Sequence, residues 1–445
     1  MAKSLYFGLM NPCLKAISAL SVLFLLACPP AQSQNTGYKA RYTTAAPVIT
    51  GETQIGAADG GTFVLGKWST TIEDSSRVMV MKLDPYGNVQ WCKYINTGGQ
   101  VENFNIYECS DGSIAIAVDL HYYINLVNFA DILLIKLNCR GEVLWNRRLN
   151  MPAIGQKWLA PNSIKEGKSG DLLLTIYNSG VDQFCVVARI DDSGNLVWSK
   201  TFNAPAMAPG FQSTLYTPIA FLQDNTVLVF GFKDEFNNSY DYNKQIFALQ
   251  LNYDNGATIL SKAYTYSEFP TNYGLFGTSP KNYFNAVHLT DGTYALFGIF
   301  SNFNLQNGYV YRLIINKDLS INTARAFVVP YGQAIPYGNI SVLPNGQTHI
   351  TSQDYDNYNV CWYAGDNTFN TIRSVKIPYP NNSIFGGNMV SQSGTTRSDY
   401  MQDGYDMAIS KRYIEETQVE DGNNKILPCL GSDFSFITTT PLQVN

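Results

Sequence analysis

Residue groupings that would carry acid–base or metal chemistry are few in this chain of 445 residues. There are three histidines, His121, His288 and His349, and no HExxH or GxSxG motif or glycine-rich phosphate loop accompanies them. Asp354 and Asp356 form a carboxylate pair, but no glycine follows at the spacing of an EF-hand calcium loop. We therefore expect no cofactor and no bound metal, and we favour a non-catalytic protein over an enzyme.

Aromatic and amide side chains gather in several segments between apolar runs. Flat rings beside amide groups suit the faces of sugars, peptide segments or another protein. The simpler alternative is that these segments only pack on one another. The candidate ligand-binding residues are His121, Tyr122, Tyr123, Phe236, Tyr240, Tyr273, Phe303, Tyr337, Tyr355 and Tyr358.

A repeated motif must position these side chains. Residues 82–93 (KLDPYGNVQWCK) return as 136–147 and 189–200, each copy with a glycine turn, a tryptophan and then a basic residue. A second set of turns runs from Asp59-Gly60 to Ser393-Gly394. Both sets recur about every 56 residues, which predicts seven structural units.

Within each unit the apolar alternation is that of β-strands. The first unit predicts strands over 47–57, 62–68, 77–83 and 89–95. Units that cannot bury both faces alone are typical of propeller blades. We expect an all-β fold, a seven-bladed β-propeller of four-stranded antiparallel blades over residues 35–430, followed by a C-terminal tail over 431–445.

A propeller must close its ring, because open terminal blades leave bare strand edges. We expect the N-terminal strand Tyr38–Thr44 to close it, and the alternative is Lys425–Cys429. Trp91, Trp145 and Trp198 should wedge between neighbouring blades rather than bind a ligand. Short glycine turns should share one face of the ring and long loops the other. Since function concentrates on elaborated loops, we place the candidate aromatic residues on the long-loop face.

The N-terminus is typical of an export signal over residues 1–34, with lysines before the apolar run 16–27. Two processing sites compete: a lipobox that would lipidate Cys28, and a small-x-small site at Ala31–Ser33, which we favour. The apolar run is too short to span a membrane comfortably. We expect an exported protein, secreted or associated with the outer surface, with no membrane span.

Six cysteines follow the signal, and their irregular spacing argues against a zinc site. Disulfides can form in an oxidising compartment, but we expect most of the cysteines to be small buried apolar residues. The net charge of −5 gives no basic footprint, so nucleic acid is excluded as a partner class.

The Asp, Gly and Trp of the repeated motif resemble the quinoprotein-like repeat of exported bacterial β-propellers, and the resemblance covers nearly the whole mature chain. It implies a seven-bladed ring of the poorly characterised surface-protein type. The motif has one residue fewer between Asp84 and Gly87 than that repeat, and adjacent cysteines are missing. Quinone binding is therefore not carried over.

The leading hypothesis is an exported, non-catalytic propeller that binds a glycan or protein through its long-loop face, as a surface or adhesion module. The alternative is a carbohydrate-active hydrolase or lyase with its site at the mouth of the central channel, where two facing carboxylates could come from separate blades. A third possibility is a structural subunit of an envelope assembly.

Overall fold

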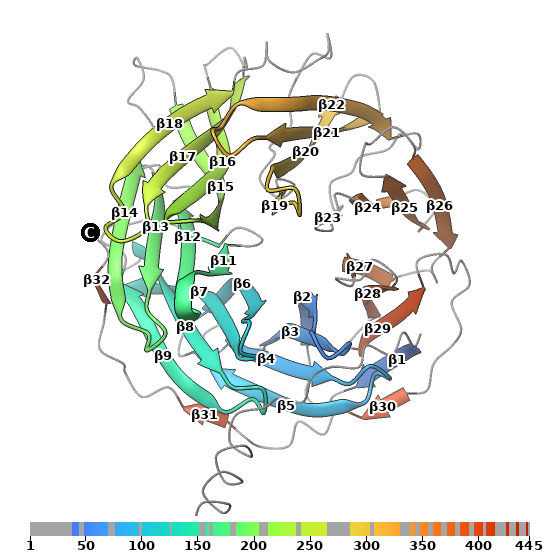
Figure 1. Cartoon of the computed structure of the whole chain (residues 1–445). Coiled ribbons are helices and arrows are strands. Elements are labelled where there is room, and N and C mark those ends of the chain that lie inside the picture. The colour runs from blue at the N-terminus through green and yellow to red at the C-terminus, as the bar shows by residue number, and fades with distance from the viewer. Residues whose placement is uncertain are drawn as a thin grey trace, which may run out of the picture.

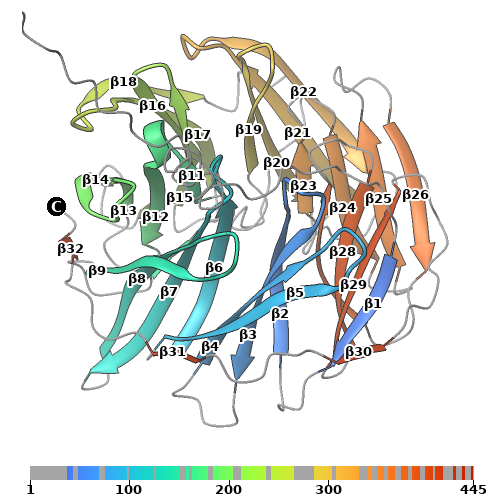
Figure 2. The ribbon, with the colours of Figure 1, turned by 60° about the horizontal axis from the view of Figure 1, so that its bottom comes forward.

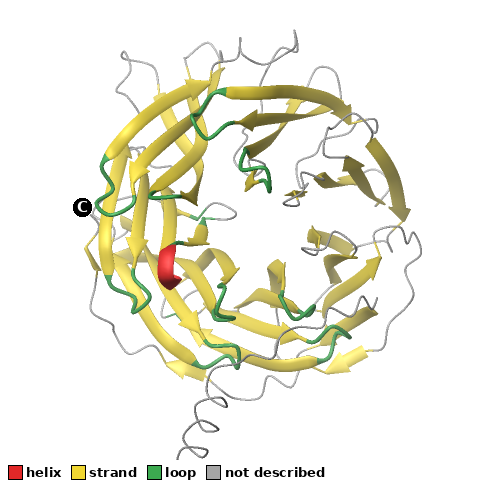
Figure 3. Cartoon of the chain, in the orientation of Figure 1, coloured by secondary structure: helices red, strands yellow, loops and turns green. Residues whose placement is uncertain are grey.

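The computed structural model of the chain is built almost entirely of β-strands (Figure 3). One short 3-10 helix, η1 (Lys168–Gly170), interrupts them within the described residues. The expected all-β class is confirmed, whereas the export signal and Cys28 lie outside the described part of the chain. The structure describes residues 38–43, 49–69, 76–97, 100–124, 127–150, 157–159, 163–178, 184–203, 212–236, 242–264, 285–302, 307–329, 339–342, 348–354, 359–365, 372–378, 383–390, 396–403, 406–413, 424–426, 433–435 and 442–443.

The strands form antiparallel sheets in chain order, which we number from sheet 1. Sheet 1 contains β2 (Ile49–Gly56), β3 (Thr62–Ser69), β4 (Ser76–Leu83) and β5 (Val89–Asn96). Sheet 2 contains β6 (Gln100–Glu108), β7 (Ile114–Ile124), β8 (Val127–Leu137) and β9 (Val143–Asn150). Sheet 3 contains β10 (Lys157–Trp158), β11 (Ile164–Glu166), β12 (Leu172–Asn178), β13 (Phe184–Ile190) and β14 (Leu196–Asn203). Both β10 and β11 pair with β12, so they act as one interrupted first strand.

The remaining sheets repeat this order. Sheet 4 contains β15 (Gln212–Gln223), β16 (Thr226–Phe236), β17 (Tyr242–Asn252) and β18 (Thr258–Tyr264). Sheet 5 contains β19 (Asn285–His288), β20 (Tyr294–Asn302), β21 (Asn307–Ile315) and β22 (Ile321–Val329). Sheet 6 contains β23 (Asn339–Val342), β24 (Thr348–Asp354), β25 (Asn359–Gly365) and β26 (Ile372–Pro378). Sheet 7 contains β27 (Ser383–Val390), β28 (Thr396–Asp403) and β29 (Asp406–Tyr413), beside which lies β1 (Tyr38–Thr43).

The sheets stand around a common centre, with the first strand of each nearest the centre and the fourth at the rim (Figure 1). A second view shows the neighbouring sheets side by side, each presenting a face to the next (Figure 2). Each of sheets 1 to 5 has four antiparallel strand positions. The structure also describes many of the side chains in these five sheets. This arrangement is the β-propeller architecture, as expected.

The predicted glycine turns are confirmed in these sheets. In turns such as 58–60, where the flanking Ala57 and Gly61 are hydrogen-bonded, the third loop residue has positive φ, which glycine adopts without strain. The turns between first and second strands use Gly60, Gly112, Gly170 and Gly292, and those between third and fourth strands use Gly87, Gly141, Gly194 and Gly256, all with positive φ. The short turns therefore share one end of the sheets, the short-turn end, as the alternation of strand direction requires.

The apolar core lies between sheets rather than within one. On β7, Ile114, Ile116 and Val118 pack in the cluster shared with sheet 1, whereas Ala115 and Ala117 pack in the cluster shared with sheet 3. Successive residues of a strand point to opposite faces. Sheet 2 is thus apolar on both sides and packs against a neighbour on each.

Both ends of the chain add strands at the rim. β1 pairs antiparallel with β29, from Tyr38 opposite Lys411 to Tyr42 opposite Met407. The C-terminal segment then adds short parallel strands to three outer edges: β30 (Asn424–Ile426) on β1, β31 (Asp433–Ser435) on β5 and β32 (Leu442–Gln443) on β9.

The described cysteines divide into two kinds. Cys109 and Cys185 are free and buried, as expected, and burial raises the pKa of Cys109 to about 11 and that of Cys185 to about 12. Cys92 and Cys139 are disulfide-bonded, so the small-apolar interpretation was wrong for them. Both lie near the rim, on β5 and in the turn after β8, where an apolar core does not enclose them.

Candidate binding faces

The tryptophans of the repeated motif join each sheet to the next at the short-turn end. Each donates its indole N–H to a backbone carbonyl in the third-to-fourth turn of the following sheet. Trp91 donates to Cys139 at 3.0 Å, Trp145 to Asp192 at 2.7 Å and Trp198 to Tyr253 at 2.7 Å. Their expected role as wedges between sheets is confirmed.

The glycine of each receiving turn makes room for the indole ring. A Cβ on Gly194 would lie 2.7 Å from Cδ2 of Trp145, and a Cβ on Gly256 would lie 2.7 Å from Cε3 of Trp198. The repeated Gly and Trp therefore belong to one inter-sheet contact, with the Trp of one copy serving the Gly of the next.

A basic residue at the end of the third strand adds a charged contact at the same end. Lys136 is 1% exposed and forms an ion pair with Asp192 of sheet 3. Burial acts to lower the pKa of Lys136, but the hydrogen bond to Asp192 and the nearby negative charges together outweigh it and raise the pKa. In sheet 1, burial dominates and lowers the pKa of Lys82, whose partner is Asp59 of the same sheet.

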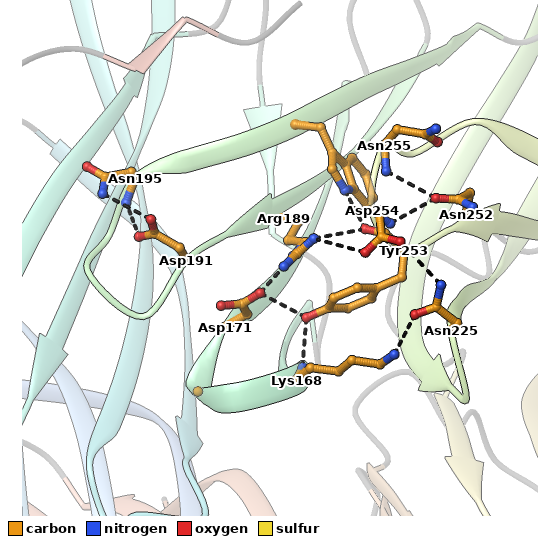
Figure 4. A network of polar contacts seen from close by, with 12 residues as sticks. Lys168, Asp171, Arg189, Asp191, Asn195, Asn225, Asn252, Tyr253, Asp254 and Asn255 are labelled. Atoms are coloured by element: carbon orange, nitrogen blue, oxygen red, sulfur yellow. Dashed lines mark hydrogen bonds and ion pairs between the residues drawn. The ribbon is translucent and has the colours of Figure 1, made fainter.

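The junction of sheets 3 and 4 holds the largest of these polar networks (Figure 4). Tyr253 accepts a hydrogen bond from the Lys168 amide at 2.7 Å and donates one to Asp171 at 2.9 Å. Arg189 bonds Asp171 at 2.7 Å and lies over the Tyr253 ring, 4.0 Å from its centre. Burial, together with the bond to Asp171, raises the pKa of the Tyr253 hydroxyl to about 12. The Tyr253 hydroxyl, the Asp171 carboxylate and the Arg189 guanidinium are therefore engaged with one another.

Glutamates at the ends of two first strands hold the turns of the preceding sheets. Glu108 accepts a hydrogen bond from the Ala58 amide at 2.7 Å, and Glu166 accepts bonds from the amide and hydroxyl of Ser110 at 2.8 and 2.9 Å. Burial raises the pKa of Glu108 despite its bond to Ala58. The polar side chains of the short-turn end are thus largely engaged in joining the sheets.

At the opposite end, the long-loop placement of three candidate residues was wrong. His121, Tyr122 and Tyr123 lie within β7, which runs to Ile124 and pairs with β8 from Val127 onward. The strand pairing continues through residues that sequence reasoning assigned to a loop, because aromatic residues also suit a strand. His121 is 1% exposed, so its imidazole is part of the interior.

The other candidate residues are only partly described. Phe236 is the last residue of β16, at the start of the connection to β17. The other six, Tyr240, Tyr273, Phe303, Tyr337, Tyr355 and Tyr358, lie outside the described residues. Their assignment to a ligand stays a prediction.

Two buried carboxylates near this end were missed by sequence reasoning. Asp119, fully buried on β7, accepts hydrogen bonds from the backbone and side-chain N–H groups of Asn103, at a register shift in β6. Asp131 on β8 forms an ion pair with Arg148 at 2.7 Å. The signal was available: a charged residue within an apolar strand indicates a paired or hydrogen-bonded role.

One depression opens at the short-turn end between sheets 2 and 3, with a volume of about 640 Å³. Its lining includes charges of both signs and the exposed side chain of Leu144. The lining residues are Asp111, Lys136, Val143, Leu144, Trp145, Asn146, Arg147, Asp192 and Ser193. None of these residues was among the candidate ligand-binding residues proposed from the sequence.

Within the described residues, no three His, Cys, Asp or Glu side chains cluster in a way that could hold a metal ion. No helix among them has the length and apolar character needed to cross a bilayer.

No family model matches the chain, and no curated protein matches it. The chain is similar to solved structures, three of which are 9–12% identical to it. An α-L-arabinanase of Penicillium chrysogenum in complex with arabinobiose is 11% identical, with a TM-score of 0.47 over 72% of this chain and 94% of its own. An α-L-arabinofuranosidase of Fusarium graminearum with an iminosugar inhibitor is 12% identical, with a TM-score of 0.45 over the same shares. The WD40 domain of SCAP from fission yeast is 9% identical, with a TM-score of 0.39 over 81% of this chain and 95% of its own. At these identities and scores the similarities assign no activity to this chain.

Proposed function

We propose that the sheets form a closed seven-bladed ring in which β1 is the fourth strand of the last blade. The pairing of β1 with β29 supports this, because it joins the N-terminal segment to a sheet made from residues 383–413. The rival segment supports it too, since β30 pairs with β1 rather than with β29. Cysteines introduced together at Ala40 and Ile409, which face each other in this register, should cross-link. A pair at Ala40 and Asp406 should not, and equal cross-linking of both pairs would exclude this closure.

We propose further that the chain is an exported, non-catalytic propeller that binds a glycan or protein through its long-loop face, as a surface or adhesion module. The observation that supports this is the use of polar groups at the short-turn end. Trp, Lys, Arg and Glu side chains there bind the turns of adjoining sheets. A rigid end of this kind suits a scaffold, and the opposite end is then the place for variable recognition segments. The disulfide-bonded Cys92 and Cys139 fit export to an oxidising compartment.

A glycan array and an extracellular-protein array test this proposal. We expect binding by the full chain that falls at least ~10-fold in Tyr122→Ala or Tyr355→Ala, in line with the loss of one good aromatic contact. The matched control is Tyr86→Ala, which removes an aromatic side chain 49% exposed at the short-turn end. Binding that depends on Tyr86 and not on Tyr122 or Tyr355 would assign ligand recognition to the short-turn end and contradict the proposal. Absence of any ligand would favour the structural subunit.

The alternative is a carbohydrate-active hydrolase or lyase, and one observation favours it. Asp111 of sheet 2 and Asp192 of sheet 3 line the same depression, and glycoside hydrolysis uses a pair of carboxylates. Partial burial acts to raise the pKa of Asp111, but hydrogen bonds from the hydroxyl and amide of Ser113 outweigh it and lower the pKa. Asp192 is paired with Lys136. The lowered pKa suits Asp111 to the carboxylate role in such a pair and not to the role of the protonated acid.

Turnover assays separate the two proposals. We expect no release of reducing sugar from a panel of soluble polysaccharides that includes arabinan. Turnover that is abolished by Asp192→Asn, in a variant that retains its melting temperature, would establish the hydrolase instead. The same assay applied to residues at the mouth of the central channel would locate the site if Asp192 is not involved.

A further inference from the structure

The depression between sheets 2 and 3 exists because of one residue difference between two equivalent junctions. Asp192 and Tyr253 hold the same position, since the carbonyl of each accepts the indole N–H of the preceding sheet's tryptophan. Lys136 and Arg189 are likewise equivalent, because each lies opposite that tryptophan in the strand register. At the junction of sheets 3 and 4 the Tyr253 ring is 1% exposed and fills the space. At the junction of sheets 2 and 3 a shorter carboxylate, 61% exposed, stands in its place.

We propose that this depression is a second binding site, independent of the long-loop face, and that it takes a neutral carbohydrate. The charged groups that line it are Lys136, Arg147, Asp111 and Asp192, so positive and negative charges are equal in number. A site of this kind gives no net attraction to a phosphate or to a cation. It offers donors and acceptors together, and vicinal hydroxyl groups of a sugar can use both.

Unused hydrogen-bonding capacity remains in the lining. Arg147 uses one N–H from each of its terminal nitrogens, toward the carbonyls of Asn146 and Ser193. A guanidinium carries five N–H donors. The side-chain oxygen of Asn146 is buried without a hydrogen-bond partner among the described residues. Most buried polar atoms are satisfied, so an orphaned acceptor beside a depression indicates a missing donor such as a hydroxyl group.

An apolar surface completes the site. Leu144 is 53% exposed although it adjoins the inter-sheet contact. Pyranose and furanose rings present C–H groups on one face and hydroxyls at the edge, which matches an apolar side chain next to charged hydrogen-bonding groups. The equivalent residue in sheet 3, Val197, is also 43% exposed, but the adjoining space there is occupied by Tyr253. The junction of sheets 2 and 3 is therefore the candidate site, and the filled junction of sheets 3 and 4 is its control.

The experiment measures binding to the full chain by saturation-transfer NMR and calorimetry. The probes are neutral mono- and disaccharides, with inorganic phosphate and spermidine as charged comparisons. We expect a saccharide to bind, and its affinity to fall on the order of 10-fold in Arg147→Ala through loss of charge-assisted hydrogen bonds. A smaller loss is expected in Leu144→Ala. Lys200→Ala and Val197→Ala, the matched changes at the filled junction, should leave the affinity unchanged.

Several results would overturn the proposal: binding of none of the saccharides, preferential binding of phosphate or spermidine, or equal losses at both junctions. Because removal of Arg147 also removes its bond to Ser193, each variant is first checked by thermal unfolding. Asp192→Asn, which keeps the size of the side chain, gives a second measure that does not depend on Arg147. Loss of saccharide binding in Tyr355→Ala alone would assign the ligand to the proposed long-loop face and exclude this site.

Discussion

Replacement of Trp198 by alanine tests the inter-sheet contact on which the fold depends. The side chain is 8% exposed, and its N–H donates to the Tyr253 carbonyl at 2.7 Å. Burying a tryptophan removes roughly 150–250 Å² from water, worth about 4–6 kcal/mol as an upper limit at ~25 cal/mol/Å². Measured Trp→Ala costs in protein cores are about 3–5 kcal/mol. We expect Trp198→Ala to lower the free energy of unfolding by this amount.

A second variant separates packing from hydrogen bonding. Trp198→Phe keeps most of the apolar contact and removes the indole donor, while Arg189 still donates to the Tyr253 carbonyl at 3.2 Å, so we expect a loss of about 0.5–1.5 kcal/mol. The control is Val197→Ala, 43% exposed on the adjacent position, with an expected change within about 0.5 kcal/mol. Urea unfolding followed by circular dichroism provides the measurement. Equal midpoints for Trp198→Ala and Val197→Ala would refute the assignment of Trp198 to the core.

Three further changes test other contacts between the sheets and at their outer edges. Gly194→Ala should destabilise the protein by at least ~1 kcal/mol in thermal unfolding, because φ is +82° and the new Cβ would lie 2.7 Å from Trp145; an unchanged melting temperature would contradict this contact. The pKa of Glu108 is raised in the folded state above the ordinary glutamate value of 4.5. As pH rises from 4.5 through the folded pKa, the native protein should therefore lose stability relative to the Glu108→Gln variant. Parallel curves of stability against pH for the two proteins would contradict this prediction. A chain ending at Gly422 lacks β30, β31 and β32 and should melt at a lower temperature, since three outer strand edges lose their added partners; equal melting would show that these pairings do not stabilise the ring.

The fold was predictable to the extent that local chemistry fixes it. The Asp-Gly and Gly turns, the strand alternation and the inter-sheet tryptophans follow from backbone sterics and apolar burial, and their positions agree with the structure. The extent of the second-to-third hairpins did not follow. His121 and Tyr122 carry no signal that separates a long strand from a loop, because pairing with β8 is decided by residues on the partner strand.

The depression could not be predicted for a different reason. In the sequence, Asp192 and Tyr253 are both ordinary turn residues. Only a comparison of the two junctions shows that Tyr253 fills a space that Asp192 leaves open. The same holds for Asp119, whose partner Asn103 is brought to it by a register shift in β6. Both properties arise from residues in different strands or sheets, which a pattern in one segment does not report.

A single turn position explains why successive junctions differ although their backbones repeat. The backbone carbonyl at this position accepts a tryptophan N–H in three successive junctions, so the main chain is fixed there and only the side chain is free to vary. At this position Cys139 forms a disulfide, Asp192 forms an ion pair beside a depression, and the buried Tyr253 donates a hydrogen bond to Asp171. Because the structural demand is met by the carbonyl, the side chain can change without loss of the inter-sheet bond. A repeat protein can therefore acquire a binding site at one junction while its neighbours remain closed.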